Sequence, residues 1–248
     1  MSNPTMSESS FTWASAGATD VGCVRQVNED TFLELPDSGL WVVADGMGGH
    51  TAGDYASGLI VEALGDVGCH DDADEFLDDV ERRLIEVNRR LFERALETER
   101  TIGSTVAAVL AFRNYFVALW AGDSRVYRRS SEGLEQITRD HSQVEELVAL
   151  GELAREDAES HPMANVITRA VGGARRLRLE ARLQGLSDFD RVLVCSDGLF
   201  KDLRHDDLDR LLCDGTAAEA CERLIDEARA RGGGDNITAI VIDFRVQA

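Results

Sequence analysis

The sequence predicts an α+β fold in which helices pack on the outside of a central antiparallel β-sandwich. Short β-prone runs that end at turn residues recur along the chain, and this pattern favours antiparallel sheets. Two longer segments carry an apolar residue every three or four positions, which is typical of amphipathic helices. Because strand-like and helical segments come in blocks, the sequence does not favour a doubly wound parallel sheet, whose strands and helices alternate.

The predicted strands are short and rich in β-branched, aromatic and small apolar residues. Most are separated by a few residues of turn type, so neighbouring strands should pair as hairpins. In chain order they are Phe11 to Ala16, Thr31 to Leu35, Leu40 to Ala44, Thr105 to Phe112, Tyr115 to Ala121, Ser124 to Tyr127, Leu177 to Leu183, Arg191 to Cys195 and Ile237 to Phe244.

Two helices are predicted from apolar stripes. The stripes are Leu77, Val80, Leu84, Val87, Leu91 and Ala95 in the first, and Ala217, Ala220, Cys221, Leu224, Ile225 and Ala228 in the second. Helical segments are expected as a block after Gly49 and again over residues 206–231. Each helix should bury its stripe against an outer face of the sandwich.

Residues 139–173 form the least regular part of the sequence. We expect two short helices and connecting loops here, outside the sandwich, in the kind of place where a flap lies. The polar residues 1–10 predict a disordered N-terminal tail. Residues 11–248 contain no low-complexity linker and therefore predict a single domain.

The charge balance excludes several function classes. The formal net charge is −20, from 26 basic and 46 acidic residues, so nucleic acid is not an expected partner. Lys201 is the single lysine, and the chain therefore has neither a phosphate-binding loop that ends in Gly-Lys nor a kinase-type lysine. No run approaches the roughly 18 apolar residues of a membrane helix, and residues 1–10 do not read as a signal peptide. We expect a cytoplasmic protein without membrane insertion.

Four aspartates lie where a β-prone run meets glycine or another small residue: Asp45 in VVADGMGG, Asp123 in LWAGDSRVY, Asp197 in LVCSDGLF and Asp235 in GGGDNITAIVI. One such aspartate alone would indicate a hairpin turn. If the strands lie side by side, however, the carboxylates converge at one end of the sandwich. Clustered carboxylates repel one another unless a cation lies between them, and oxygen ligands without His or Cys favour Mg²⁺ or Mn²⁺. Two such ions about 4 Å apart could share an aspartate and activate water.

The segment CVRQVNEDTFL is a second candidate and directly precedes a predicted strand. Its Arg25 could bind two phosphate oxygens at once, and Glu29 and Asp30 could hold metal-bound water. Taken alone, these residues would rather indicate a surface ion pair at i, i+4 or i, i+5.

Eight segments occur in a characteristic order: RQVNED, VVADGMGG, GSTVAAVL, WAGDSRVYR, TRDHS, NVITRAVGG, LVCSDGLF and GGGDNITAIVI. In this order they resemble the bacterial branch of the metal-dependent serine/threonine protein phosphatases, the PPM or type 2C family. The resemblance extends from about Ala16 to Phe244. It implies a four-layer αββα fold, with two antiparallel sheets face to face and helix pairs outside.

The resemblance also implies a set of metal ligands. Asp45 would bridge two Mn²⁺ or Mg²⁺ ions, and the backbone carbonyl of Gly46 would complete the ligands of the second. Asp197 and Asp235 would bind the first ion. Asp123, together with Asp197, matches the place where bacterial members hold a third, weaker ion.

The remaining residues of the implied site act on water and on the substrate. Glu29 and Asp30 would act mainly through water, and Arg25 would bind the phosphate. The implied reaction is direct attack of a metal-bridging water on phosphorus, without a phosphoenzyme intermediate. Met47 departs from the eukaryotic branch, which has a histidine here as proposed general acid. His50 and metal-bound water are the alternative proton donors.

The implied partners are phosphorylated proteins, including a bacterial serine/threonine kinase and its substrates, in some bacteria within a type VI secretion cluster. We expect a monomer, and we expect His141 to be a structural residue at the edge of the flap. Two alternatives stay open. One is a catalytically silent regulator of the same fold that binds phosphoproteins, and the other is a relative that acts on an anti-sigma-factor antagonist.

Overall fold

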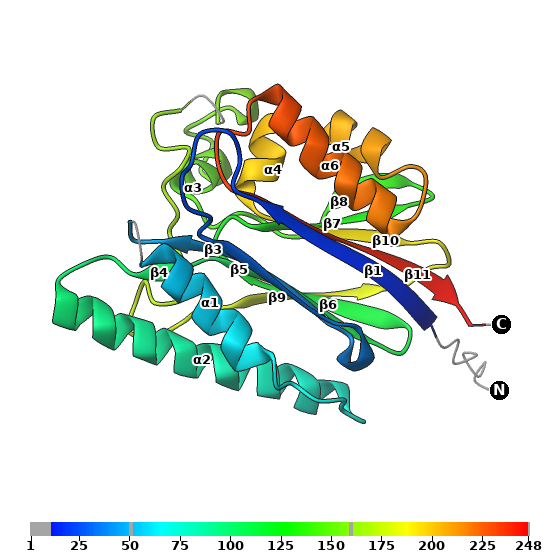
Figure 1. The fold of residues 1–248 in the computed structure, drawn as a ribbon, viewed down its shortest axis with the longest axis horizontal. Coiled ribbons are helices and arrows are strands. Elements are labelled where there is room, and N and C mark those ends of the chain that lie inside the picture. The colour runs from blue at the N-terminus through cyan, green and yellow to red at the C-terminus, as the bar shows by residue number, and fades with distance from the viewer. Residues whose placement is uncertain (1–10, 50–51, 159–160, 248) are drawn as a thin grey trace.

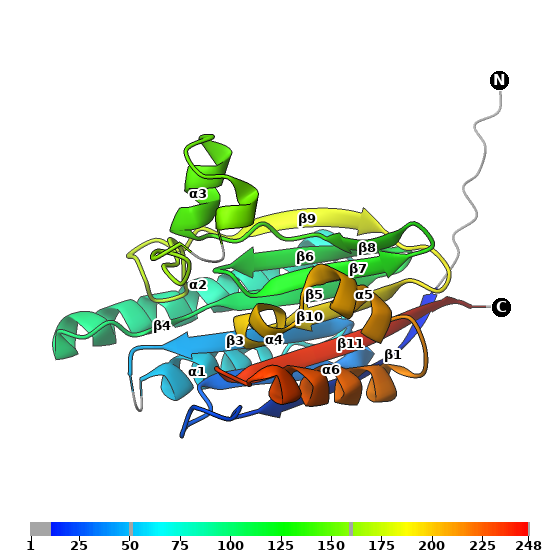
Figure 2. The same cartoon turned by 90° about the horizontal axis from the view of Figure 1, so that it is seen from above.

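The computed structural model describes residues 11–49, 52–158 and 161–247, which form four layers (Figures 1 and 2). Two antiparallel sheets pack face to face, and helices cover both outer faces. The predicted αββα arrangement is therefore confirmed. The expected disordered tail, residues 1–10, lies outside the described residues. No helix in the described part of the chain is long and apolar enough to cross a membrane.

The first sheet has the strand order β1-β11-β10-β7-β8. Its strands are β1 (Phe11–Asp20), β7 (Arg125–Ser130), β8 (Gly133–Gln136), β10 (Arg191–Cys195) and β11 (Ile237–Val246). β1 pairs with β11 along its whole length, from Phe11 opposite Val246 to Asp20 opposite Ile237. The segment that connects β1 to β2 and the segment that precedes β11 therefore lie at the same end of this sheet.

The second sheet has the strand order β2-β3-β5-β6-β9, and the short β4 pairs with β3. Its strands are β2 (Asp30–Leu35), β3 (Leu40–Met47), β4 (Gly103–Ser104), β5 (Val106–Phe112), β6 (Tyr115–Ala121) and β9 (Glu180–Gly185). The β2–β3 register places Asp30 opposite Asp45. Every predicted strand is present, although the run expected from Leu177 to Leu183 forms its strand from Glu180 onward, and β4 and β8 were not predicted.

The helices divide between the two outer faces. Those on the second sheet are α1 (Gly53–Leu64) and α2 (Ala73–Thr98), and those on the first are α4 (Asp197–Asp202), α5 (His205–Leu211) and α6 (Ala217–Arg231). The Asp72 carboxylate caps α2 by accepting hydrogen bonds from the N–H groups of Asp74 and Glu75. Both predicted helices are present. The short α4, which begins at Asp197 itself, was not predicted.

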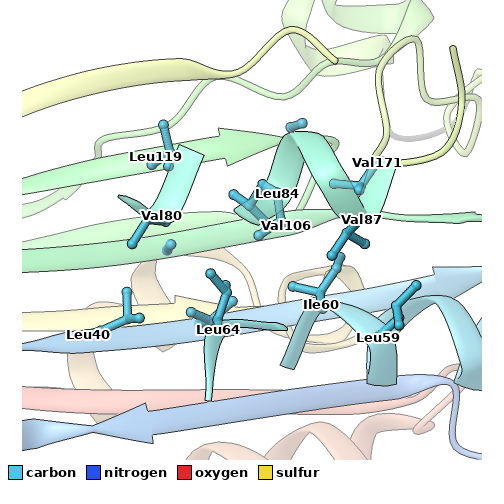
Figure 3. Close-up of a cluster of buried hydrophobic side chains, with 14 of the residues drawn as sticks. Leu40, Leu59, Ile60, Leu64, Val80, Leu84, Val87, Val106, Leu119 and Val171 are labelled. Atoms are coloured by element: carbon cyan, nitrogen blue, oxygen red, sulfur yellow. The ribbon is translucent and has the colours of Figure 1, made fainter. Parts of the chain in front are cut away.

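Strand alternation separates the layers of the core. In β3, Leu40, Val42 and Ala44 face α1 and α2, as Figure 3 shows for Leu40. Trp41 and Val43 face the other sheet instead. Burial of each large apolar side chain contributes about 1.5–3 kcal/mol. The two sheets are thereby held in fixed positions, and so are the loops at their ends.

Candidate active site

A cavity of about 350 Å³ lies at the end of the sandwich where the four predicted aspartates are found. Asp45, Asp123, Asp197 and Asp235 all line it, so the predicted convergence of these residues is confirmed. The other lining residues are Arg25, Glu29, Gly46, Met47, Gly48, Gly49, Thr105, Asn165, Ile167, Lys201 and Asn236.

The cavity spans both sheets because its aspartates come from strand ends in each. Asp45 belongs to β3 and Asp123 follows β6, both in the second sheet, whereas Asp197 follows β10 and Asp235 precedes β11. The Thr105 hydroxyl connects two of these ends. It accepts a 3.0 Å hydrogen bond from the N–H of Asp45 and lies 2.6 Å from the hydroxyl of Ser124.

Asp30 does not line the cavity but lies buried beside it. Its Oδ2 accepts hydrogen bonds from the hydroxyls of Ser196, at 2.6 Å, and Thr238, at 2.7 Å. Ser196 directly precedes Asp197, so this carboxylate joins β2 to the strand end that carries Asp197. The expected action of Asp30 through water stays a prediction.

Two glycines allow Glu29 to approach the end of β3. A Cβ atom at Gly53 would lie 2.3 Å from Glu29 Oε1 and 2.8 Å from the Gly46 carbonyl oxygen. A Cβ atom at Gly46 would lie 2.0 Å from the Gly53 carbonyl oxygen. Glycine is therefore required at both positions, because any larger residue would separate Glu29 from Gly46.

The Asn236 side chain anchors the loop that carries Arg25. Its Oδ1 accepts a 2.8 Å hydrogen bond from the N–H of Glu29, and its Nδ2 donates to the carbonyls of Val21 and Val27, each at 3.0 Å. The loop before β2 is therefore fixed to the residue next to Asp235.

The buried carboxylates have strongly raised pKa values. Burial raises the pKa of Asp45 well above its usual range, and the surrounding carboxylates raise it further. Burial also raises the pKa of Asp30 and of Asp123, each to about 7. Such a group of acids favours the binding of protons or of other cations, because ionising them all together is costly.

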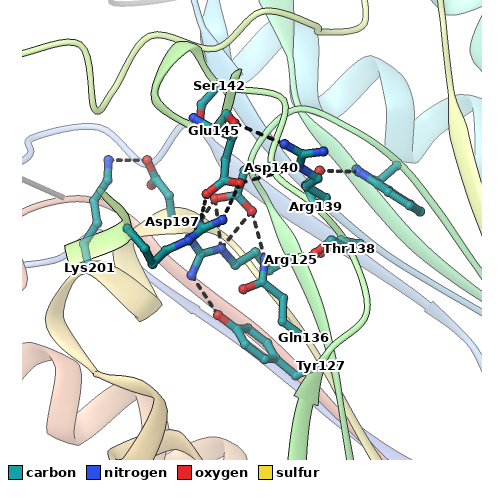
Figure 4. Close-up of polar contacts among 12 residues, drawn as sticks. Arg125, Tyr127, Gln136, Thr138, Arg139, Asp140, Ser142, Glu145, Asp197 and Lys201 are labelled. Carbon is teal, nitrogen blue, oxygen red and sulfur yellow. Dashed lines mark hydrogen bonds and ion pairs between the residues drawn. The ribbon is translucent and has the colours of Figure 1, made fainter. Parts of the chain in front are cut away.

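Two side-chain cations pair with the remaining carboxylates. The Arg25 guanidinium binds Asp235 through two contacts of 2.9 Å. The Lys201 ammonium binds Asp197 from the next turn of α4, as Figure 4 shows. The alternative of a local ion pair in the Arg25 segment is therefore wrong, since the partner of Arg25 lies near the other end of the chain.

The donor set fits divalent metal ions of the Mn²⁺ or Mg²⁺ type. It consists of carboxylates and a backbone carbonyl, which are hard oxygen ligands. Glu29 Oε1 is buried and has no hydrogen-bond partner. In residues 11–49, 52–158 and 161–247 no three carboxylate, His or Cys side chains already meet at one ion-sized point. Asp197 and Asp235 are paired with Lys201 and Arg25.

Residues 139–173 contain α3 (Gln143–Ala149) and the short 3-10 turn η2 (Arg155–Asp157), in agreement with the two predicted short helices. Figure 2 shows α3 standing away from the sheets. This segment supplies Asn165 and Ile167 to the cavity lining, which the sequence did not indicate. Residues 159–160 lie outside the described part.

His141 connects that segment to the turn before Asp123. The ring Nδ1 of His141 accepts a 3.1 Å hydrogen bond from the backbone N–H of Gly122, and the backbone N–H of His141 donates to the Gly122 carbonyl at 2.9 Å. The ring stacks on Trp120, and burial lowers its pKa. These contacts support a structural role for His141.

A partly buried polar cluster packs against α4. Arg125 forms a bidentate pair with Asp140 and donates to Tyr127, as Figure 4 shows. Its guanidinium carbon lies 3.5 Å from the centre of the Phe200 ring. Because Phe200 precedes Lys201 in α4, this contact fixes the helix that carries both Asp197 and Lys201.

Four polar lining residues were not predicted as site residues: Thr105, Asn165, Lys201 and Asn236. For Lys201 a signal was available, since it follows Asp197 by four residues and would share its side of a helix. His50, one of the alternative proton donors, lies outside the described residues. Met47 lines the cavity.

Comparisons with known proteins agree with this geometry. A family model described as Protein phosphatase 2C matches residues 24–231. The serine/threonine phosphatase stp of Listeria monocytogenes is 33% identical over 235 residues, which cover 91% of this chain and 93% of that protein. A solved structure described as PppA, a key regulatory component of T6SS in Pseudomonas aeruginosa, matches with a TM-score of 0.88 and 39% identity. That match covers 96% of this chain and 100% of the other.

A second solved structure is the catalytic domain of the serine threonine protein phosphatase PstP in complex with 2 manganese ions. It matches with a TM-score of 0.84 and 32% identity, over 95% of this chain and 99% of that one.

Proposed function

The chain belongs to the protein phosphatase 2C family of serine/threonine protein phosphatases. We propose that it hydrolyses phosphoserine and phosphothreonine with Mn²⁺ or Mg²⁺ bound by its strand-end carboxylates. The observation that carries this proposal is the convergence of Asp45, Asp123, Asp197 and Asp235 on one cavity that also contains Arg25. The manganese ions described for PstP support the choice of metal.

Two ions would share the centre of the cavity. Asp45 would bridge them, Asp197 and Asp235 would bind the first, and the Gly46 carbonyl would bind the second. The other candidate ligands are Glu29 and Asp30, mainly through water, and Asp123, which with Asp197 matches the place of a third ion.

Each part of the site would have its own task in the reaction. Bound between the carboxylates, Mn²⁺ or Mg²⁺ would supply Lewis-acid chemistry and a water molecule activated for direct attack on phosphorus. Arg25 would exchange its Asp235 contact for two phosphate oxygens, a pairing that suits its planar guanidinium. Met47 carries no proton that it could give to the leaving serine or threonine oxygen.

The proposal is tested with purified protein and phosphoserine or phosphothreonine peptides. Phosphate should be released in the presence of Mn²⁺ and not in excess chelator. Acid quenching during turnover of a radioactively phosphorylated peptide should leave no label on the protein. A labelled protein would contradict direct attack, and chelator-resistant activity would contradict the metal requirement. Peptide binding without hydrolysis would identify a silent regulator instead.

The biological setting extends the same proposal. We propose a cytoplasmic enzyme that opposes a serine/threonine kinase. The likeness to PppA, described as a key regulatory component of T6SS, supports a type VI secretion system as one setting. Phosphopeptides from cells with and without the protein should differ at the sites of that kinase. An unchanged set of phosphopeptides would argue against this partnership.

A further inference from the structure

The only lysine of the chain, Lys201, lines the cavity of the candidate active site. It lies on α4, four residues after Asp197, and residues at this spacing share one side of a helix. Its ammonium group binds the Asp197 carboxylate, and Figure 4 shows the two side chains reaching toward each other.

The same ammonium group lies near Asp123. Lys201 and Asp123 line one cavity, and Lys201 is the cation that opposes the carboxylates around Asp123. The ammonium group paired with Asp197 therefore supplies a positive charge at the part of the cavity formed by Asp123 and Asp197.

The sum of the charges in the cavity indicates how Lys201 affects the number of bound ions. Glu29, Asp45, Asp123, Asp197 and Asp235 line the cavity and Asp30 lies buried beside it, so the fully ionised carboxylates carry six negative charges. Arg25 and Lys201 with two divalent ions carry six positive charges, which balances the group. A third divalent ion would add an excess of positive charge close to the ammonium group, and like charges at short distance repel each other.

We propose that the Lys201 ammonium group takes the place of a third divalent ion beside Asp123 and Asp197, so that this chain binds two ions tightly and excludes the third. The inference rests on the proposed two-ion site, and it assigns to Lys201 a positioning role rather than contact with the reacting phosphate.

The test is a titration of the purified full chain with Mn²⁺, in which free Mn²⁺ is measured by its electron paramagnetic resonance signal. The wild type should bind two ions tightly. Lys201→Met should bind a third at a free Mn²⁺ concentration at least about tenfold lower than the wild type requires, because a repelling charge has been removed. Lys201→Arg keeps the charge and should behave as the wild type.

A second substitution locates the gained ion. Lys201→Met combined with Asp123→Asn should lose it again, since one of its two carboxylates is gone. Arg175→Met removes one exposed positive charge outside the cavity and should leave all ion numbers unchanged. Circular dichroism melting should show that all variants are folded.

Two results would overturn the inference: tight binding of three ions by the wild type, or ion binding by Lys201→Met that equals that of the wild type. Failure of the proposed function would look different, because the wild type would then bind no Mn²⁺ tightly and release no phosphate.

Discussion

The guanidinium of Arg25 binds the Asp235 carboxylate through two contacts of 2.9 Å, although 210 residues separate the two in the chain. The Asn236 amide holds both partners in place, because it fixes the loop before β2 to the start of β11. The proposed phosphate-binding cation is therefore positioned by a proposed metal ligand before substrate arrives.

Arg25→Ala should mainly weaken substrate binding. Loss of charge-assisted hydrogen bonds worth about 1.5–3 kcal/mol should raise the KM for a phosphothreonine peptide by roughly 10- to 100-fold. Arg25→Lys should recover only part of the loss, since an ammonium group cannot bind two oxygens in a fork. Steady-state kinetics at saturating Mn²⁺ would show this, with Arg175→Ala as the control. An unchanged KM in Arg25→Ala would exclude the phosphate-binding role.

Gly53→Ala should disturb the site, whereas Gly58→Ala in the same helix should not. A Cβ atom at Gly53 would lie 2.3 Å from Glu29 Oε1, while one at Gly58 would meet nothing within 4 Å. Gly58→Ala should therefore stabilise the protein by about 0.5–1 kcal/mol through helix propensity. Gly53→Ala should lose stability and Mn²⁺ affinity. Urea unfolding and Mn²⁺ titration of both variants measure the difference, and equal behaviour would contradict the close approach of Glu29.

Metal-free protein should become less stable as the pH rises from about 4 to about 7. Folding raises the pKa of Asp30 and of Asp123 to about 7 and raises that of Asp45 as well. In this interval the unfolded chain has lost protons that the folded chain still holds, so each pH increase favours unfolding. Each kcal/mol lost lowers Tm by about 2–4 °C in a chain of this size.

Melting curves with chelator and with saturating Mn²⁺ would test this pH dependence. Mn²⁺ should reduce the slope, because bound cations stabilise the ionised carboxylates. A metal-free Tm that stays constant or rises over this interval would contradict the raised pKa values.

Local sequence patterns predicted most of the fold. A continuous apolar run identifies the strand at Leu40 to Ala44, since both of its faces are buried, each against a different layer. β4 has two residues and β8 has the sequence GLEQ, and neither is long or apolar enough to produce a pattern. The expected strand at Leu177 began too early because apolar residues there pack against the helix layer without pairing.

Site residues that directly follow a predicted strand could be predicted from the sequence. Those that enter the site through contacts between distant segments could not. Asp45 and Asp197 follow apolar runs, so their convergence could be inferred from the antiparallel fold. The amide of Asn236 acts on the carbonyls of Val21 and Val27, and no local pattern reports a contact over that separation. Asn165 and Ile167 come from an irregular segment, whose path depends on tertiary packing.

Replacement of the Asp45 carboxylate tests the central claim most directly. This carboxylate should lower the stability of the metal-free protein and should be essential for Mn²⁺ binding and activity. Burial and neighbouring carboxylates raise its pKa, so Asp45→Asn should raise the Tm of the metal-free protein. The same variant should lose tight Mn²⁺ binding, and kcat/KM for a phosphothreonine peptide should fall by at least about 10²-fold, as expected when several kcal/mol of metal stabilisation are lost. Asp226→Asn, an exposed change on α6, should alter none of these quantities.

The decisive measurement is therefore phosphate release and Mn²⁺ binding by Asp45→Asn on one folded sample. The account predicts a more stable metal-free protein that neither holds the ions tightly nor turns over the peptide. An Asp45→Asn protein that retains wild-type Mn²⁺ binding and wild-type phosphate release would contradict it.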